Sequence, residues 1–288
     1  MLRGFKMITV TGATGNIGRT LVELLAGAGE KVRAVSRRAD PGAGATDGVE
    51  WVRADIGAAE GLRSAADGAR ALFLLLAGEL NSRGEDPAVL VGAARDAGVE
   101  RIVLVSSQAG ATRPDAVSHA RLREFEGAVR SSGLDFTVLR PGGFASNAFA
   151  WAETVRTRRT VLAPFGDVAL PVVDPADIAA VAAAALREDG HAGRTYELTG
   201  PEAVSPRRQT EILAEALGED VAFVELSRAE AHAHLARFMP EEVVHGTLDI
   251  LGRPLPEERR VSPDVATVLG RPAAPFGAWA ARHLPAFR

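Results

Sequence analysis

The chain has 288 residues, of which 47% are hydrophobic and 24% charged, and its formal net charge at pH 7 is −4. This slightly acidic balance gives no general attraction for nucleic acid or for an anionic membrane surface. The lack of cysteine excludes disulfide bonds, thiolate zinc sites and thiol catalysis. No apolar stretch has the length of a membrane span and no secretory signal is evident, so we expect a cytoplasmic protein.

The N-terminal stretch predicts a strand, a tight turn and a helix. An apolar run at residues 7–11 leads into glycines spaced by three, and apolar residues at helical spacing follow. Gly12 would allow the sharp turn, Gly15 the close approach of a phosphate, and Gly18 the packing of helix on strand. The spacing predicts dinucleotide binding, and a purely structural turn is the alternative. The backbone N–H groups expected to face a pyrophosphate belong to Gly12, Thr14, Gly15, Asn16, Ile17 and Gly18.

The end of the second predicted strand indicates which nucleotide binds. Residues 31–36 form this strand, which ends in Ser36-Arg37-Arg38. An acidic residue here would read the ribose of NAD, whereas arginine accommodates the 2′-phosphate of NADP. We therefore expect NADP(H) in preference to NAD(H), with Ser36, Arg37 and Arg38 as ligands. Asp40 keeps NAD as an alternative. Another alternative is that Arg37 and Arg38 bind no nucleotide and are simply exposed to solvent.

Two stretches carry a family resemblance. Thr-Gly-Ala-Thr-Gly-Asn-Ile-Gly at residues 11–18 and Leu-Arg-Pro-Gly at residues 139–142 resemble the NmrA-like branch of the atypical short-chain dehydrogenase/reductases. The resemblance implies that Asp55, followed by Ile56, contacts the adenine, although Asp55 could instead cap a helix. The apolar run at residues 71–76 predicts a central strand buried on both faces. The residues expected to border the cofactor at its end are Leu76, Ala77 and Gly78.

The chain departs from the family at the catalytic residues. Classical members place a serine after the fifth strand, and it assists a tyrosine and a lysine four residues apart in the next helix. Ser106 and Ser107 hold the serine position, but the chain has one tyrosine, Tyr196, and two lysines, Lys6 and Lys31. The catalytic pair is therefore absent.

Three side chains remain as candidates for orienting a substrate carbonyl. They are Ser106, Ser107 and His119, which lies in a helix predicted over residues 117–130. Histidine suits proton donation because its unperturbed pKa is near 6.5. A surface histidine is the alternative for His119.

The turn after the sixth strand is expected to border the nicotinamide and the substrate. Pro141 would fix this turn and Gly142 would leave room for the ring. The resemblance implies a contact role for Phe144 and Asn147, and Trp151 would line the substrate cavity. A structural turn and a core position are the alternatives.

The predicted fold is α/β, a doubly wound parallel-sheet Rossmann fold with a smaller C-terminal α/β lobe. Residues 1–145, joined by residues 172–200, would form the NADP-binding domain. Residues 146–171 and 201–288 would form the smaller substrate-binding lobe.

We expect no metal site. His232 and His234 follow a capping box at Ser227 and Glu230. Two residues apart on a helix, the two imidazoles would point to different sides.

Two functions remain open at this level. The first is an NADPH-dependent oxidoreductase that transfers hydride to a small conjugated electrophile, such as a quinone, without the Tyr-Lys pair. The alternative is a non-catalytic NADP-sensing regulator that acts through a protein partner. The enzyme would bind a small-molecule substrate, no nucleic acid and no membrane, as a monomer or homodimer.

Overall fold

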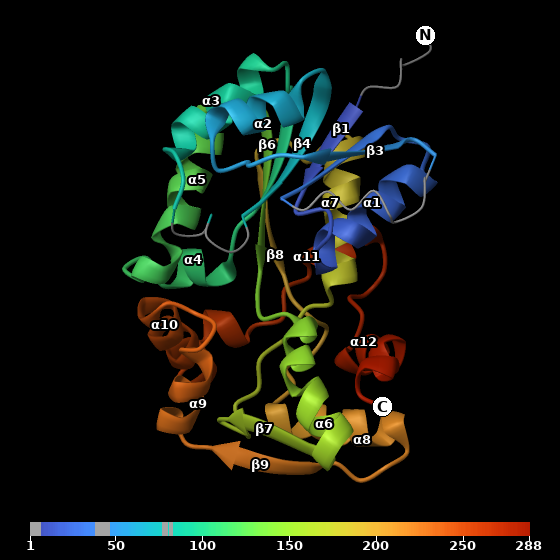
Figure 1. Ribbon diagram of the computed structural model, residues 1–288, viewed down its shortest axis with the longest axis vertical. Coiled ribbons are helices and arrows are strands. Elements are labelled where there is room, and N and C mark those ends of the chain that lie inside the picture. Colours follow the sequence, from blue (N-terminus) through green and yellow to red (C-terminus); the bar gives the residue numbers. More distant parts are fainter. Residues whose placement is uncertain (1–6, 38–46, 77–79, 81–82) are drawn as a thin grey trace. The chain divides into compact units, whose positions relative to one another are not determined.

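The computed structural model describes residues 7–37, 47–76, 80 and 83–288 (Figure 1). The chain divides into two compact units. The first comprises Met1–Gly110, His119–Arg140 and Ile178–Tyr196, and the second comprises Ala111–Ser118, Pro141–Asp177 and Glu197–Arg288. From the sequence we expect one domain to bind the nucleotide and the other to bind the substrate. This assignment of functions to the two units stays a prediction.

The first unit contains a seven-stranded sheet with the order β3-β2-β1-β4-β5-β6-β8. The pairings from β3 to β6 are parallel. The strand order reverses between β1 and β4, and ligands of such sheets bind beyond the carboxyl ends of the strands at this reversal. The strands are β1 (Met7–Thr11), β2 (Val32–Ser36), β3 (Val49–Arg53), β4 (Ala69–Leu75), β5 (Arg101–Val105), β6 (Asp135–Pro141) and β8 (Arg194–Leu198).

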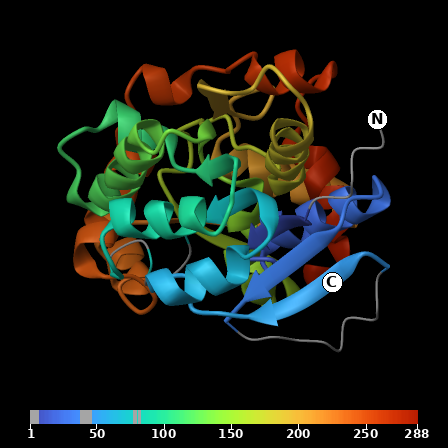
Figure 2. The same cartoon turned by 90° about the horizontal axis from the view of Figure 1, so that it is seen from above.

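Helices cover both faces of this sheet, which confirms the doubly wound α/β prediction (Figures 1 and 2). On one face, Leu62, Leu90 and Phe125 bury their side chains against Leu72 and Leu104 of the sheet. The helices on this face are α2 (Ala59–Ala66), α3 (Pro87–Asp96) and α5 (Ala120–Ser131), and those on the other are α1 (Asn16–Gly27) and α7 (Pro175–Arg187).

One predicted helix begins later than expected. Residues 117–119 form a 3-10 turn, η2 (Val117–His119), before α5 starts. The reason is that His119 has non-helical backbone angles, φ −118° and ψ 6°. Another short helix, α4 (Gln108–Thr112), follows β5.

The second unit combines a small parallel sheet with short helices. β7 (Thr160–Pro164) pairs with β9 (Ala222–Leu226). The predicted capping box of Ser227 and Glu230 is present at the start of α9. The core of this unit contains aromatic rings among smaller apolar side chains, and Phe149 meets the buried Trp279 edge to face at 5.0 Å between ring centroids. Its helical segments are η3 (Ala145–Trp151), α6 (Ala152–Arg158), α8 (Pro206–Leu217), α9 (Arg228–Leu235), α10 (Glu241–Gly252), η4 (Glu257–Arg259), α11 (Asp264–Leu269), α12 (Phe276–His283) and η5 (Leu284–Ala286).

Among the residues described, no helix is long and apolar enough to cross a membrane.

Candidate active site

The glycine turn lies between β1 and α1, at the point where the strand order reverses. Gly12 has a φ of +63°, which favours glycine, and the Gly15 amide donates to the Gly12 carbonyl at 2.9 Å. Gly15 also precedes the first residue of α1, and no side chain caps this helix end. The amides of the first helical turn are therefore available to an anion, and the pyrophosphate contacts stay a prediction.

The other two glycines of the motif differ in what excludes a side chain. A Cβ at Gly18 would lie 2.2 Å from the Gly12 carbonyl oxygen, so Gly18 is required for packing the helix on the turn. A Cβ at Gly15 would lie 3.3 Å from the same oxygen, a contact that small shifts can relieve. The fold itself therefore needs glycine less at position 15 than at position 18. The close approach of a phosphate would give a separate reason for glycine at position 15.

A cavity of about 520 Å³ in the first unit is lined by several arginines. Arg37 follows β2, Arg53 ends β3, and Arg83 lies in the segment before α3. The lining includes three arginines and one carboxylate, that of Asp55, so it favours an anion. The rest of the lining is Ala54, Gly57, Leu80 and Gly84.

Hydrogen bonds hold the walls of this cavity. Arg121 of α5 donates to the carbonyl oxygens of Leu80 and Glu85, at 2.9 and 2.7 Å. The Glu85 amide donates to the Gly57 carbonyl at 3.0 Å. Leu80 and Glu85 are therefore held by α5, and Glu85 also by the turn after β3.

Asp55 lies in the turn before α2, whose N-cap is Ala58, and it also lines the cavity. Its Oδ1 accepts a hydrogen bond from the Gly57 amide at 3.0 Å, so it stabilises the turn before α2. It is also exposed in the cavity lining, where an adenine contact stays a prediction. Ile56 is buried in the core and Leu76 is buried at the end of β4. The predicted ligands Arg38, Ala77 and Gly78 lie outside the described residues.

Ser106 is part of a buried polar network. Its hydroxyl donates to Glu126 at 2.6 Å, and Arg140 donates to both oxygens of that carboxylate, at 3.0 and 2.6 Å. Burial alone would raise the pKa of Glu126, but hydrogen bonds from Arg140 and Ser106 outweigh it and lower the pKa. Ser107 is half-buried, and its hydroxyl accepts from the Ala109 amide at 3.2 Å. Ser107 is therefore better placed than Ser106 to meet a ligand.

Tyr196 is paired with a histidine. Its hydroxyl lies 2.9 Å from Nδ1 of His191. Burial lowers the pKa of His191 below its ordinary value, which favours a neutral imidazole beside the phenol. The described part of the chain holds a single lysine, Lys31, which is exposed just before β2. His119 is half-buried at the start of α5, and its catalytic role stays a prediction.

The predicted nicotinamide and substrate residues belong to the second unit. The Gly142 amide donates to Leu198 at 3.0 Å, and Phe144 forms a parallel bridge with Val173. Asn147 is exposed, and Trp151 is half-buried against the aromatic core. These contacts give the turn a structural role, and the ligand contacts of Pro141, Gly142, Phe144, Asn147 and Trp151 stay predictions.

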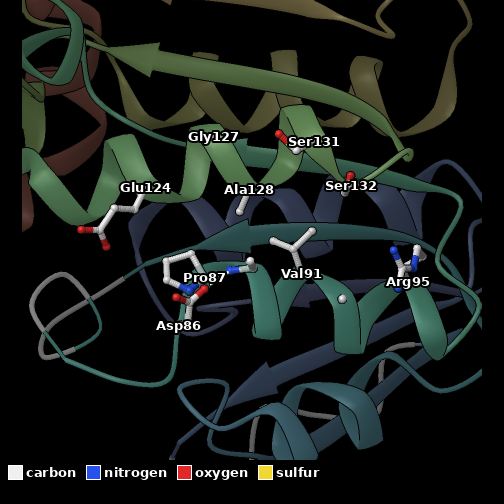
Figure 3. A pocket seen from close by; sticks show the side chains of 11 residues that line it. Asp86, Pro87, Val91, Arg95, Glu124, Gly127, Ala128, Ser131 and Ser132 are labelled. Atoms are coloured by element: carbon white, nitrogen blue, oxygen red, sulfur yellow. Dashed lines mark hydrogen bonds between the residues drawn. The ribbon is translucent and has the colours of Figure 1, made fainter.

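A different hollow, of about 450 Å³, lies between α3 and α5 in the first unit (Figure 3). Pro87 and Val91 of α3 and Ala128 of α5 line it. The arginine-lined cavity contains the predicted ligands Arg37 and Asp55, whereas this hollow contains no predicted site residue.

The fold and the glycine turn define a Rossmann-type nucleotide-binding protein, and comparisons with known proteins identify the family. A family model described as NAD(P)H-binding matches residues 12–189. The chain is 40% identical to the (4-alkanoyl-5-oxo-2,5-dihydrofuran-3-yl)methyl phosphate reductase of Streptomyces griseus, over 98% of this chain and 99% of that protein. The chain belongs to the NAD(P)H-binding family and is an NAD(P)H-dependent oxidoreductase.

Two solved structures show the same fold. The NADPH-dependent quinone oxidoreductase of Escherichia coli, complexed with NADPH, matches with a TM-score of 0.80 at 27% identity, over 96% of this chain and 99% of that one. NmrA, a negative transcriptional regulator in complex with NADP, matches with a TM-score of 0.75 at 20% identity, over 97% of this chain and 95% of that one. At that identity, the likeness to NmrA shows the fold alone.

Sequence reasoning missed Arg53, Arg83 and Arg121. Arg53 could have been found, because β3 runs parallel to β2 and both strands end at the same sheet edge. Arg83 and Arg121 depend on contacts between distant segments, which no local pattern shows.

Proposed function

We propose that the protein is an NADPH-dependent reductase that transfers hydride to a small conjugated electrophile such as a quinone. The observation that carries the cofactor preference is the cavity where Arg37, Arg53 and Arg83 outnumber the single carboxylate of Asp55. A 2′-phosphate would supply the negative charge that this lining favours. A charge-assisted hydrogen bond contributes roughly 1.5–3 kcal/mol, which corresponds to about a tenfold to hundredfold preference for NADPH over NADH.

The residues around the glycine turn fit the rest of the cofactor. The uncapped amides at the start of α1 would hold the pyrophosphate, and the missing side chain of Gly15 would let it approach. Asp55, which lines the cavity, would border the adenosine, and Leu76, which follows β4, keeps its expected place beside the cofactor. When bound, NADPH supplies the hydride.

The pairing of Tyr196 with His191 supports a conjugated acceptor. A simple ketone reduced by hydride needs a proton donor for the alkoxide, and a tyrosine beside a lysine is what this superfamily provides. Here the phenol contacts an imidazole. A quinone or an activated alkene spreads the added charge through its own conjugation, so it can take its proton from water or from a group such as His119.

Two relatives act on substrates of this kind. The name of the Streptomyces griseus reductase describes a ring alkene conjugated to a lactone carbonyl and an alkanoyl group. The Escherichia coli enzyme is a quinone oxidoreductase. Both names denote conjugated electrophiles, which supports this substrate class for the present chain.

The reaction is tested by following NADPH oxidation with three acceptors. They are a benzoquinone, an alkanoyl dihydrofuranone carrying a methyl phosphate, and a saturated cyclic ketone. We expect turnover with at least one conjugated acceptor and little with the ketone. Efficient reduction of the ketone alone would contradict the proposal.

The cofactor preference is tested by calorimetric titration with NADPH and NADH. Arg83→Ala should weaken NADPH binding about tenfold or more and leave NADH binding unchanged. Arg95→Ala is the control, because Arg95 is an exposed arginine of α3 that pairs with Asp96. Equal affinities of the wild type for the two nucleotides would refute the assignment.

A regulator that binds NADP without turnover is the second candidate. The same Tyr196–His191 pairing favours it, since no phenol-ammonium pair is present among the described residues. NADPH binding together with no oxidation by any acceptor of the panel would decide for this alternative.

A further inference from the structure

Two histidines and a glutamate converge on the hairpin formed by α9 and α10 in the second unit. Nε2 of His232 lies 2.8 Å from Oε1 of Glu241, and Nε2 of His245 lies 3.2 Å from the same oxygen. The candidate ligand atoms of the three residues all lie within 4.8 Å of one another. Two imidazoles thus present the same ring nitrogen to one carboxylate oxygen, although they come from different helices.

Contacts away from the three residues hold the two helices in register. Ala231 of α9 packs with Val244 and Leu248 of α10 in a small apolar core. Arg228, near the start of α9, donates to Asp249 at 2.6 Å and to the Leu248 carbonyl at 3.2 Å. Glu241 and His245 are also one helical turn apart on α10. The spacing of the three side chains is therefore largely fixed by the hairpin.

We propose that His232, Glu241 and His245 form a binding site for a divalent transition metal, with Zn²⁺ as the expected ion. Two imidazole nitrogens and one carboxylate oxygen are a ligand set that zinc uses, with water in the fourth position. Zinc–ligand distances of about 2.0–2.1 Å in a tetrahedron place neighbouring ligand atoms about 3.3 Å apart. The Nε2–Oε1 separations of 2.8 and 3.2 Å are close to this value, and the ligand atoms of the two histidines lie within 4.8 Å of each other, so side-chain movements would complete the tetrahedron.

The surroundings of the site favour a cation. Among the described residues, the ion-pair partners found for Glu241 are these two imidazoles, so no arginine or lysine there competes for its charge. The side chains of Glu241 and His245 are 61% and 57% exposed, which leaves a solvent-facing side for entry and for the water ligand. A bound ion would bridge α9 and α10, and this role is independent of the proposed reductase activity.

The chain supplies a matched control. His234 lies on α9 two residues after His232, is exposed, and meets Phe238 at 5.8 Å between ring centroids. It has the same side chain on the same helix but lies outside the cluster. Its replacement therefore tests whether any surface histidine would bind the ion.

The experiment uses the full chain without a histidine tag, after removal of metals with a chelator. Calorimetry with Zn²⁺ should give one site per chain, and Co²⁺ should give the visible absorption of a tetrahedral complex. His245→Ala should weaken Zn²⁺ binding by at least about a hundredfold and abolish the tetrahedral Co²⁺ spectrum, and Glu241→Gln should weaken binding at least tenfold. His234→Ala should bind as the wild type does.

The result that would overturn the proposal is defined for each variant. Absence of Zn²⁺ binding to the wild type, or unchanged binding in His245→Ala and Glu241→Gln, rules out this site. Equal losses in His234→Ala and His245→Ala would show nonspecific binding and also refute it. Far-ultraviolet circular dichroism checks folding. His245→Ala and Glu241→Gln are at exposed helix positions, where alanine and glutamine favour helix. Slower amide exchange of α9 and α10 on adding Zn²⁺ to the wild type is the independent readout expected, and unchanged exchange would contradict bridging.

Discussion

Replacement of Ser106 separates a structural role from a catalytic one. Ser106 is 6% exposed, and its hydroxyl donates to Glu126 at 2.6 Å. Ser106→Ala removes one donor from a carboxylate whose side chain is 7% exposed. A hydrogen bond to a charged group contributes about 1.5–3 kcal/mol, and Arg140 remains to hold the charge. We therefore expect the free energy of unfolding to fall by about 1.5–3 kcal/mol.

Thermal unfolding measures this loss. At roughly 2–4 °C per kcal/mol for a chain of this size class, Ser106→Ala should lower Tm by about 3–12 °C. Ser107→Ala is the comparison, because the Ser107 hydroxyl accepts from the Ala109 amide and has a neutral partner, so its loss should cost about 0.5–1.5 kcal/mol, less than the loss in Ser106→Ala. Turnover of Ser106→Ala at a temperature where it is folded should stay within a fewfold of wild type. An unchanged Tm with a hundredfold loss of kcat would refute the structural role.

The network also predicts a pH dependence. The pKa of Glu126 is lower in the folded protein than in the unfolded chain, so its stabilising contribution is present above the unfolded pKa, near 4.3. That contribution is lost as the pH falls through the folded pKa. Glu126→Gln should therefore flatten the acid side of the stability profile, which denaturant titrations at several pH values would measure. An equally steep acid limb in the variant would contradict this assignment.

Three further perturbations test the cofactor site and the chemistry. Arg37→Ala should weaken NADPH binding about tenfold to hundredfold in calorimetry, and an unchanged affinity would refute its contact with the 2′-phosphate. Gly15→Val should abolish NADPH binding while circular dichroism stays native, whereas Gly27→Val, where an added Cβ would meet no other part of the chain within 4 Å, should still bind; equal affinities would refute the phosphate role. Tyr196→Phe should leave stopped-flow hydride transfer within a fewfold of wild type, and His119→Ala should cost less than the 10²–10⁴-fold typical of general acid catalysis. A thousandfold loss in Tyr196→Phe would show that the phenol is the proton donor.

Most of the first unit follows from local patterns in the sequence. The glycine spacing, the alternation of apolar runs with helical periodicity and the continuous run of β4 predict the doubly wound fold, and the structure confirms it. β7, at Thr160–Pro164, was missed because five residues that end in proline give little periodicity. The predicted start of α5 was three residues too early for a similar reason, because helical spacing does not show the non-helical backbone angles of His119.

The arginine cavity was predictable in part. Arg37 follows from the strand-end rule, and Arg53 follows from the same rule applied to the neighbouring strand. Arg83 reaches the cavity because Arg121 holds the carbonyls of Leu80 and Glu85, residues 41 and 36 positions away. A contact of that range depends on how α5 packs, and single-sequence patterns do not contain this information.

The histidines of the second unit also show that sequence patterns predict positions within a helix but not contacts between helices. Helical geometry correctly separates His232 from His234, and within α10 it places Glu241 and His245 on one face. What it cannot supply is the register between the two helices, which the Arg228–Asp249 pair and the apolar contacts fix. The geometry of one helix therefore excludes a shared ion only for the pair His232 and His234. The three-residue cluster exists only once two helices are folded against each other, so its ligand chemistry becomes visible at the level of packing.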